Sequence, residues 1–153
     1  NKFDDGKILY MVRDPLSVIP SGLSLVTGVL DKKFNFWSMP ADKRQQFINK
    51  LYNALKELLI RFHDDWETNK IDKSKVMIVR FDRMMDDFDG LMKDILKFLD
   101  YQPSEDFLKN IIETSAKQKK FKSSHNYNLE KFGLTEQKIK KDCENIYTTF
   151  FSN

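Results

Sequence analysis

The hydrophobic positions of this chain follow two spacings, which separate two expected strands from several expected helices. Residues 7–12 and 75–80 contain short apolar runs that have the length of buried strands. Between residues 47 and 66, apolar side chains instead recur at steps of three and four, the spacing of one helical face. That face is wide enough for a core helix packed on a sheet. Its members are Phe47, Leu51, Leu55, Leu58, Phe62 and Trp66.

The end of the chain predicts another helix, and the region after residue 28 predicts an irregular stretch. Thr135 has the character of an N-cap, with Leu134 and Ile139 placed around it as a hydrophobic staple. Residues 28–40 have no clear periodicity, and we expect exposed aromatic side chains there. The aromatics of that stretch are Phe34, Phe36 and Trp37. The apolar face of the last helix comprises Ile139, Cys143, Ile146, Tyr147 and Phe150.

The order of these elements predicts an α/β protein with a parallel sheet flanked by helices. The two recognisable strands are separated by long helical stretches, and connections of that kind join parallel strands. Ligands of such sheets bind at the carboxyl ends of the strands. Arg13 follows the first strand and Phe81 follows the second, so we expect both at that edge of the sheet.

The segment after the first strand has the composition of an anion-binding turn. Arg13 ends the strand, and Asp14 and Pro15 fit an N-cap and a first helical residue. A helix start offers unpaired N–H groups and a partial positive charge, and a guanidinium can hold two oxygens of a phosphate. Ser21 follows Arg13 by eight residues on the same expected helix. Taken alone, the segment fits equally well an arginine at a sheet edge followed by an ordinary helix.

This arrangement resembles the 3′-phosphate-binding motif of the sulfotransferases, which use 3′-phosphoadenosine-5′-phosphosulfate (PAPS) as donor. In that family an arginine after a strand and a serine eight residues on hold the 3′-phosphate, and Arg13 and Ser21 occupy these positions. Pro20 should kink or delay the helix near Ser21, which makes Ser17 the alternative ligand. We favour Ser21 because its spacing matches the family.

The rest of the chain is similar to the later half of that family, in the expected order. Residues 75–84 resemble the strand that ends in an aromatic and an acidic residue. Residues 98–107 resemble a helix that ends in Phe-Leu, followed by a helix that starts at Pro103 and Ser104. Residues 123–135 resemble the Ser-x-His-x-Tyr and Phe-Gly-Leu-Thr ending of many members.

The resemblance implies further donor-site residues, each of which also has a structural interpretation. Phe81 would stack on or line the adenine, or serve as a core ring. Thr114 and Ser115 match a Thr-Ser pair near the adenine, or end a helix with solvated hydroxyls. A late basic loop would close over the 3′-phosphate, or form a solvated charged face. The expected cofactor-binding residues are Arg13, Ser21, Phe81, Thr114, Ser115, Lys120, Lys122 and Ser123.

The chain lacks the features by which that family binds the 5′ end of the donor. None of its five glycines stands in a phosphate-cradling pattern such as G-x-x-x-x-G-K-[ST]. The six residues before Lys7 leave no room for the family's catalytic base, so no catalytic residue is assigned. We therefore expect residues 1–153 to form a single partial domain, the C-terminal half of a P-loop-NTPase-like sulfotransferase fold, inactive on its own.

Composition narrows the class of function. A length of 153 residues suits one domain, and a net charge of +3 with a pI near 8.8 is too modest for a dedicated nucleic-acid binder. One cysteine excludes an internal disulfide, and two distant histidines offer no metal-site spacing. No membrane-spanning run or signal peptide is visible. The compartment stays open: the cytoplasm is favoured, and the Golgi lumen is the alternative if an N-terminal anchor is missing.

The sequence therefore predicts a sulfotransferase that moves a sulfuryl group from PAPS to a hydroxyl or amine of a small molecule or glycan. The product nucleotide would be 3′,5′-adenosine bisphosphate (PAP), and this chain would hold its 3′-phosphate and adenosine. One alternative is a non-catalytic sulfotransferase-like binding or assembly module. Another is a nucleic-acid-binding helical domain, because residues 129–141 superficially resemble a helix-turn-helix. The acceptor and the oligomeric state are not determined by these residues.

Overall fold

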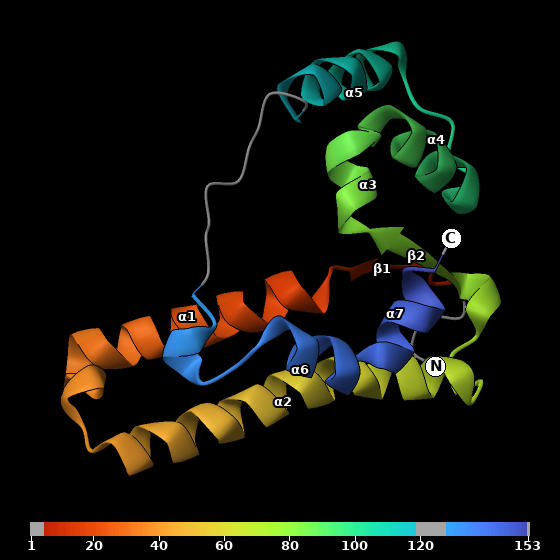
Figure 1. Ribbon diagram of the computed structural model, residues 1–153. Coiled ribbons are helices and arrows are strands. Elements are labelled where there is room, and N and C mark those ends of the chain that lie inside the picture. Colours follow the sequence, from red (N-terminus) through yellow and green to blue (C-terminus); the bar gives the residue numbers. More distant parts are fainter. Residues whose placement is uncertain (1–4, 119–127, 153) are drawn as a thin grey trace. The chain divides into compact units, whose positions relative to one another are not determined.

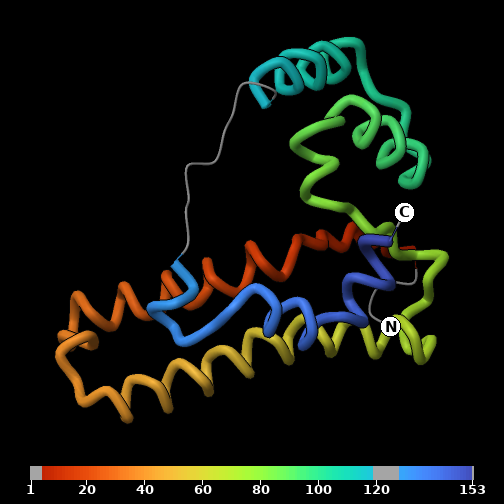
Figure 2. The backbone as a smooth tube through the Cα atoms, viewed as in Figure 1, coloured from red at the N-terminus to blue at the C-terminus, as the bar shows by residue number. Residues whose placement is uncertain are grey.

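The computed structural model describes residues 5–118 and 128–152, and the chain divides into two compact units (Figures 1 and 2). Unit 1 comprises Asn1–Arg13 and Asn69–Ser124. Unit 2 comprises Asp14–Thr68 and His125–Asn153. The chain therefore passes from one unit to the other between Arg13 and Asp14, within the segment expected to bind an anion.

Unit 1 contains the sheet and three helices. Strands β1 (Ile8–Val12) and β2 (Val76–Arg80) pair in parallel, with Ile8 opposite Val76 and Val12 opposite Arg80. This pairing confirms the parallel arrangement expected from the long helical connection. A 3₁₀ turn, η2 (Lys73–Lys75), precedes β2. The helices that follow it are α3 (Phe81–Asp86), α4 (Phe88–Leu99) and α5 (Glu105–Gln118).

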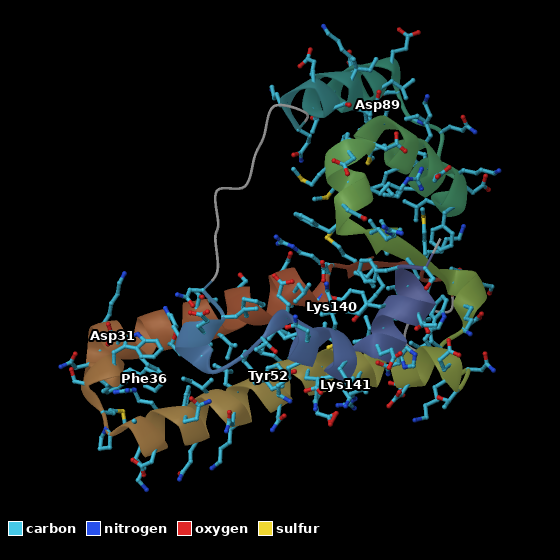
Figure 3. All side chains as sticks on the ribbon, in the orientation of Figure 1. Asp31, Phe36, Tyr52, Asp89, Lys140 and Lys141 are labelled. Atoms are coloured by element: carbon cyan, nitrogen blue, oxygen red, sulfur yellow. The ribbon has the colours of Figure 1, made fainter. Side chains whose placement is uncertain are left out.

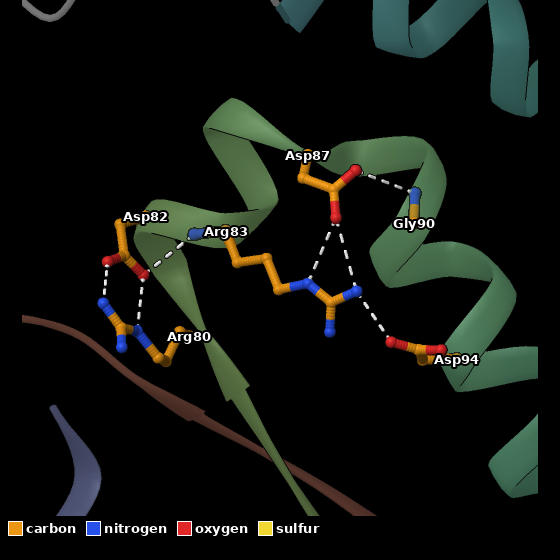
Figure 4. Close-up of polar contacts among 6 residues, drawn as sticks. All are labelled: Arg80, Asp82, Arg83, Asp87, Gly90 and Asp94. Carbon is orange, nitrogen blue, oxygen red and sulfur yellow. Dashed lines mark hydrogen bonds and ion pairs between the residues drawn. The ribbon is translucent and has the colours of Figure 1, made fainter. Parts of the chain in front are cut away.

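Charged side chains organise the turn between β2 and α4 (Figure 4). Arg80 donates two hydrogen bonds to the Asp82 carboxylate, at 3.1 and 2.5 Å. Arg83 bridges Asp87 and Asp94, with nitrogen–oxygen distances of 3.3 and 2.6 Å. The Asp87 carboxylate also caps α4 by accepting from the Gly90 N–H. The first residue of α3, Phe81, therefore lies in a turn whose flanking charges are paired.

All the secondary-structure elements among the described residues of unit 2 are helices. Its elements are α1 (Pro15–Phe34), η1 (Phe36–Ser38), α2 (Ala41–Glu67), η3 (Glu130–Phe132), α6 (Glu136–Asp142) and α7 (Glu144–Phe150). Helix α1 packs on α2 and α6, and α7 packs on α2. Thr135 caps α6 by accepting from the Lys138 N–H, as expected. The most buried side chains include Ile19, Leu23, Phe36, Ile48, Tyr52, Phe132, Ile139 and Cys143. Figure 3 labels two of them, Phe36 and Tyr52.

The structure corrects two expectations about helix packing in this unit. Within unit 2, helix α2 packs on the helices α1 and α7, and Leu58, placed on its core face by periodicity, is 67% exposed. The stretch expected to be irregular instead continues α1 as far as Phe34. Phe36 is buried, in edge-on contact with the rings of Trp37 and Phe47. Periodicity alone marks a helical face and does not identify what covers it.

Helix α1 also runs through Pro20 without ending. Pro20 lies inside the helix and is fully buried, together with Ile19 and Leu23. A proline here removes one backbone donor, but packing of an apolar face supplies most of the stability of a helix in a protein. The expected delay at this proline does not occur, and Ser21 lies within the helix.

The two glycines of α1 provide a test of its packing on α2. A β-carbon added at Gly22 would lie 2.9 Å from a δ-carbon of Leu55, whereas one at Gly28 would meet nothing within 4 Å. We expect Gly28→Ala to stabilise unit 2 by about 0.5–1 kcal/mol, the helix-interior preference of alanine over glycine. Gly22→Ala should not increase the stability of unit 2, because the new β-carbon would force the Leu55 side chain to move. Urea unfolding measures the stability of both variants. An equal increase in stability for the two would contradict the close approach of α1 to Leu55 at Gly22.

The half-buried carboxylate of Asp142 predicts how the stability of unit 2 changes at low pH. Asp142 accepts hydrogen bonds from Lys138 at 2.9 Å and from the Tyr52 hydroxyl at 2.7 Å. These two donors lower the pKa of Asp142 below its usual value. The folded state therefore binds this proton less readily than the unfolded state does, so the stabilisation is present at neutral pH and is lost as pH falls below about 4.

We expect Asp142→Asn to lower the free energy of unfolding at pH 7 and to matter much less at pH 3. Urea unfolding at the two pH values measures the difference. Tyr52→Phe, which removes one of the two donors, should show the same trend with a smaller amplitude. A cost of Asp142→Asn that is identical at both pH values would show that the ionised carboxylate does not contribute.

Candidate anion site at the carboxyl ends of the strands

The parallel register brings Arg13 and Phe81 together. Val12 pairs with Arg80, so Arg13 and Phe81 are the next residues on neighbouring strands. The central guanidinium carbon of Arg13 lies 4.2 Å from the centre of the Phe81 ring. This distance is well within the range of a cation–π contact. The expectation that both residues lie at the same edge of the sheet is confirmed.

Arg13 differs from the other arginines of unit 1 in its partner. Arg80 and Arg83 each bind carboxylates. Among the described residues of unit 1, Arg13 has the Phe81 ring as its contact and forms no ion pair. A ring face engages the flat face of a guanidinium, whereas the N–H donors point outward in its plane. A cation–π contact does not require these in-plane donors, so the Arg13 guanidinium keeps the capacity to bind an anion.

The first turn of α1 contributes less to anion binding than its sequence suggests. Asp14 is the N-cap, and its carboxylate accepts from the Leu16 N–H at 2.8 Å. The N–H groups of Ser17 and Val18 donate to the Asp14 carbonyl, at 2.8 and 3.0 Å. Pro15 has no N–H. The expectation of unpaired donors at this helix start is wrong, because Asp14 satisfies them.

Asp14 is also held from the far end of the chain. The Tyr147 hydroxyl, on α7, donates to the Asp14 carboxylate at 2.5 Å. Burial, together with this hydrogen bond to Asp14, raises the pKa of Tyr147. The phenol therefore stays protonated and remains a donor at neutral pH. Sequence reasoning placed Tyr147 only on an apolar face and missed this contact, for which a one-dimensional pattern contains no indication.

The other expected site residues lie in different surroundings. Ser21 and Ser17 are both half-buried on α1, which belongs to unit 2, whereas Arg13 belongs to unit 1. Thr114 is half-buried near the end of α5, and Ser115 beside it is 4% exposed. Thr114 is thus the more accessible of the pair. Lys120, Lys122 and Ser123 lie outside the described residues.

Comparison with protein families gives the chain its class. The family model described as "Sulfotransferase domain" matches residues 2–145. The chain belongs to the sulfotransferase domain family. No curated protein and no solved structure matches it significantly. Family membership supports sulfuryl transfer in general, and a nucleotide donor with an acceptor substrate. The small parallel sheet and predominantly helical structure are consistent with the α/β class expected of a sulfotransferase.

Cys143 and His63 lie in surroundings that suit a structural role. Within residues 5–118 and 128–152, no group of acidic, histidine or cysteine side chains could hold a metal, and no helix is long and apolar enough to span a membrane. Burial raises the pKa of the Cys143 thiol to about 11, which keeps it protonated and unreactive. His63 is hydrogen-bonded to Thr149 and Asp64 and only 12% exposed, which fits a structural role.

Unit 2 also has an open surface cavity of about 510 Å³ beside Lys140 and Lys141 (Figure 3). Its hydroxyls already donate elsewhere: Thr148 to the Glu144 carbonyl and Ser152 to the Tyr147 carbonyl. The two lysine ammonium groups remain as donors, and the Glu144 carboxylate in the same lining partly offsets their charge. Its lining residues are Lys140, Lys141, Glu144, Tyr147, Thr148 and Ser152.

The bond between Tyr147 and Asp14 predicts a measurable contribution to folding. A hydrogen bond to a charged group is worth about 1.5–3 kcal/mol. Tyr147→Phe keeps the ring and removes the donor, so we expect a loss of stability of about 1–3 kcal/mol. Tyr101→Phe is the matched control, since Tyr101 is 56% exposed. Thermal and urea unfolding compare the two, and equal stabilities would show that the Asp14 contact contributes nothing.

Proposed function

We propose that this chain forms the 3′-phosphate and adenosine side of a PAPS-dependent sulfotransferase. The observation that carries the proposal is Arg13 at the carboxyl end of β1, stacked on Phe81 and with no carboxylate partner in unit 1. A sulfotransferase moves a sulfuryl group to a hydroxyl or amine acceptor. Within that reaction, the residues of this chain would bind and orient the donor, and the base would come from another part of the protein.

Arg13 suits the recognition of a phosphate rather than a general attraction to anions. A guanidinium presents parallel N–H donors that match two phosphate oxygens, and such charge-assisted bonds are stronger than neutral ones. The Ser21 hydroxyl, eight residues further on in α1, is the proposed second ligand. A 3′-phosphate distinguishes PAPS and PAP from ATP, so contacts of Arg13 and Ser21 with this phosphate would select the donor nucleotide.

The remaining donor contacts belong to the proposal on the strength of the family resemblance. Thr114 is placed near the adenine, and its partial exposure on α5 is compatible with that role. Ser115 is buried, so it would support α5 rather than touch the nucleotide. Lys120, Lys122 and Ser123 would add positive charge and a hydroxyl around the 3′-phosphate.

We further propose that the sheet is part of a larger, P-loop-like one. Parallel sheets are normally covered on both faces, because their connections place helices there. In β1, however, Ile8 is 55% exposed, Leu9 is 42% exposed and Met11 is 50% exposed. Apolar residues on both faces of this strand thus lack a cover. Further strands and helices would cover these apolar residues, and they would also contain the 5′ phosphosulfate loop and the base. Residues 1–153 alone would therefore not catalyse transfer.

The proposal predicts strong dependence of nucleotide binding on Arg13. We expect Arg13→Ala in the full-length protein to weaken PAP binding at least tenfold, as the loss of charge-assisted hydrogen bonds worth about 1.5–3 kcal/mol implies. Adenosine 5′-phosphate (AMP), which lacks the 3′-phosphate, should bind far more weakly than PAP to the wild type and should be little affected by the variant. Isothermal titration calorimetry measures both nucleotides.

The control for this experiment is Arg61→Ala, which removes an exposed arginine of α2 in the other unit. Arg61→Ala should leave PAP binding unchanged. It removes the same charge as Arg13→Ala, so it shows whether the loss of binding comes from the specific Arg13 contact or from the lower net charge. Equal PAP affinities for the wild type and Arg13→Ala would refute the proposed phosphate site. Binding of PAP without any transfer by the full-length protein would instead support the non-catalytic module.

A further inference from the structure

The contact between Arg13 and Phe81 has a consequence for the role of the ring. The guanidinium covers one face of Phe81 at 4.2 Å, so that face is not available to an adenine. The position of the ring is set by the backbone, since Phe81 is the first residue of α3 and follows β2 directly. A ring placed in this way can define where the guanidinium lies before any ligand arrives.

Arg13 is a long side chain, and among the described residues of unit 1 its contact is with the Phe81 ring. The neighbouring arginines are held by carboxylates, which also neutralise them. An aromatic ring orients a guanidinium without neutralising its charge and without using its in-plane donors. Phe81 therefore leaves Arg13 both ordered and able to bind a phosphate, a combination that an aspartate at this position would not allow.

We propose that Phe81 is a positioning residue that sets Arg13 for the 3′-phosphate, rather than an adenine-stacking residue. The inference rests on the proposed function, since it needs a 3′-phosphate at Arg13. It makes Phe81 a determinant of the selectivity between PAP and AMP. An adenine-stacking ring, by contrast, would contribute equally to the binding of both nucleotides, because both contain adenosine.

The two roles of Phe81 predict different ratios of PAP affinity to AMP affinity, which calorimetry can measure on the full-length protein. We expect Phe81→Leu to weaken PAP binding about fivefold, within the range of cation–π contributions, and to leave AMP binding within about twofold of wild type. Phe81→Tyr, which keeps the aromatic face, is the matched control and should preserve both affinities. Arg13→Lys should cost less in the Phe81→Leu background than in the wild type, because lysine has no planar face to stack.

Ring fluorination gives a second measurement that preserves the shape of the side chain. Replacing Phe81 with phenylalanines of increasing fluorine content withdraws electron density from the ring face and weakens its attraction for a cation. PAP affinity should fall stepwise along the series while AMP affinity stays constant. Circular dichroism and the melting temperature establish that each variant is folded.

The outcomes separate this inference from the proposed function. If the wild type binds PAP and AMP equally, the 3′-phosphate site itself is absent, and the positioning role fails with it. If the wild type prefers PAP, but Phe81→Leu weakens both nucleotides by the same factor, the ring acts on the adenine and the inference alone is overturned. Unchanged PAP affinity in both Phe81→Leu and the fluorinated series also overturns it.

Discussion

The parallel register of β1 and β2 is the constraint on which the candidate site depends. Because Val12 lies opposite Arg80, the residues that follow them leave the sheet side by side. A shift by one residue would send these side chains to opposite faces of the sheet. The cation–π contact between Arg13 and Phe81 is therefore a product of strand pairing, although the two residues are far apart in the sequence.

The segment after β1 contains two adjacent charged residues, Arg13 and Asp14, which have different structural roles. The carboxylate of Asp14 is occupied by the Leu16 N–H and by the Tyr147 hydroxyl, so it serves the start of α1. Arg13, one residue earlier, has an aromatic partner. The proposed anion site therefore rests on a side chain and not on the helix start, because a carboxylate already fills the place where a helix dipole would attract an anion.

The sequence predicted the features that depend on local pattern. The strands, the N-caps at Asp14 and Thr135, and the buried face through Ile139 and Cys143 all follow from periodicity and capping chemistry. The parallel pairing followed from the long connection between strands. Family motifs at Arg13 and in the later half of the chain led to the sulfotransferase class, which the family match confirms.

What the sequence could not predict are contacts between distant positions. Helix α2 has an apolar stripe, yet its pattern does not distinguish a sheet from the helices α1 and α7 that cover it. Leu58 belongs to the stripe by its spacing and is nevertheless 67% exposed. The link from Tyr147 to Asp14 spans 133 residues and involves a tyrosine that reads as an ordinary core residue. Such pairings depend on tertiary packing, which a local pattern does not encode.

The arginines of unit 1 show how one residue type is divided between folding and binding. Arg80 and Arg83 lie within a few residues of Asp82 and Asp87, and they pair with these carboxylates in the turn that leads from β2 to α4. Their charges are therefore neutralised locally, and exposed pairs of this kind add little to stability. Arg13 instead meets the ring of Phe81, which holds its orientation but cannot cancel its charge. A binding site for a multiply charged anion needs a cation that the fold orders without neutralising, and in this turn an aromatic neighbour meets that need where an acidic one would not.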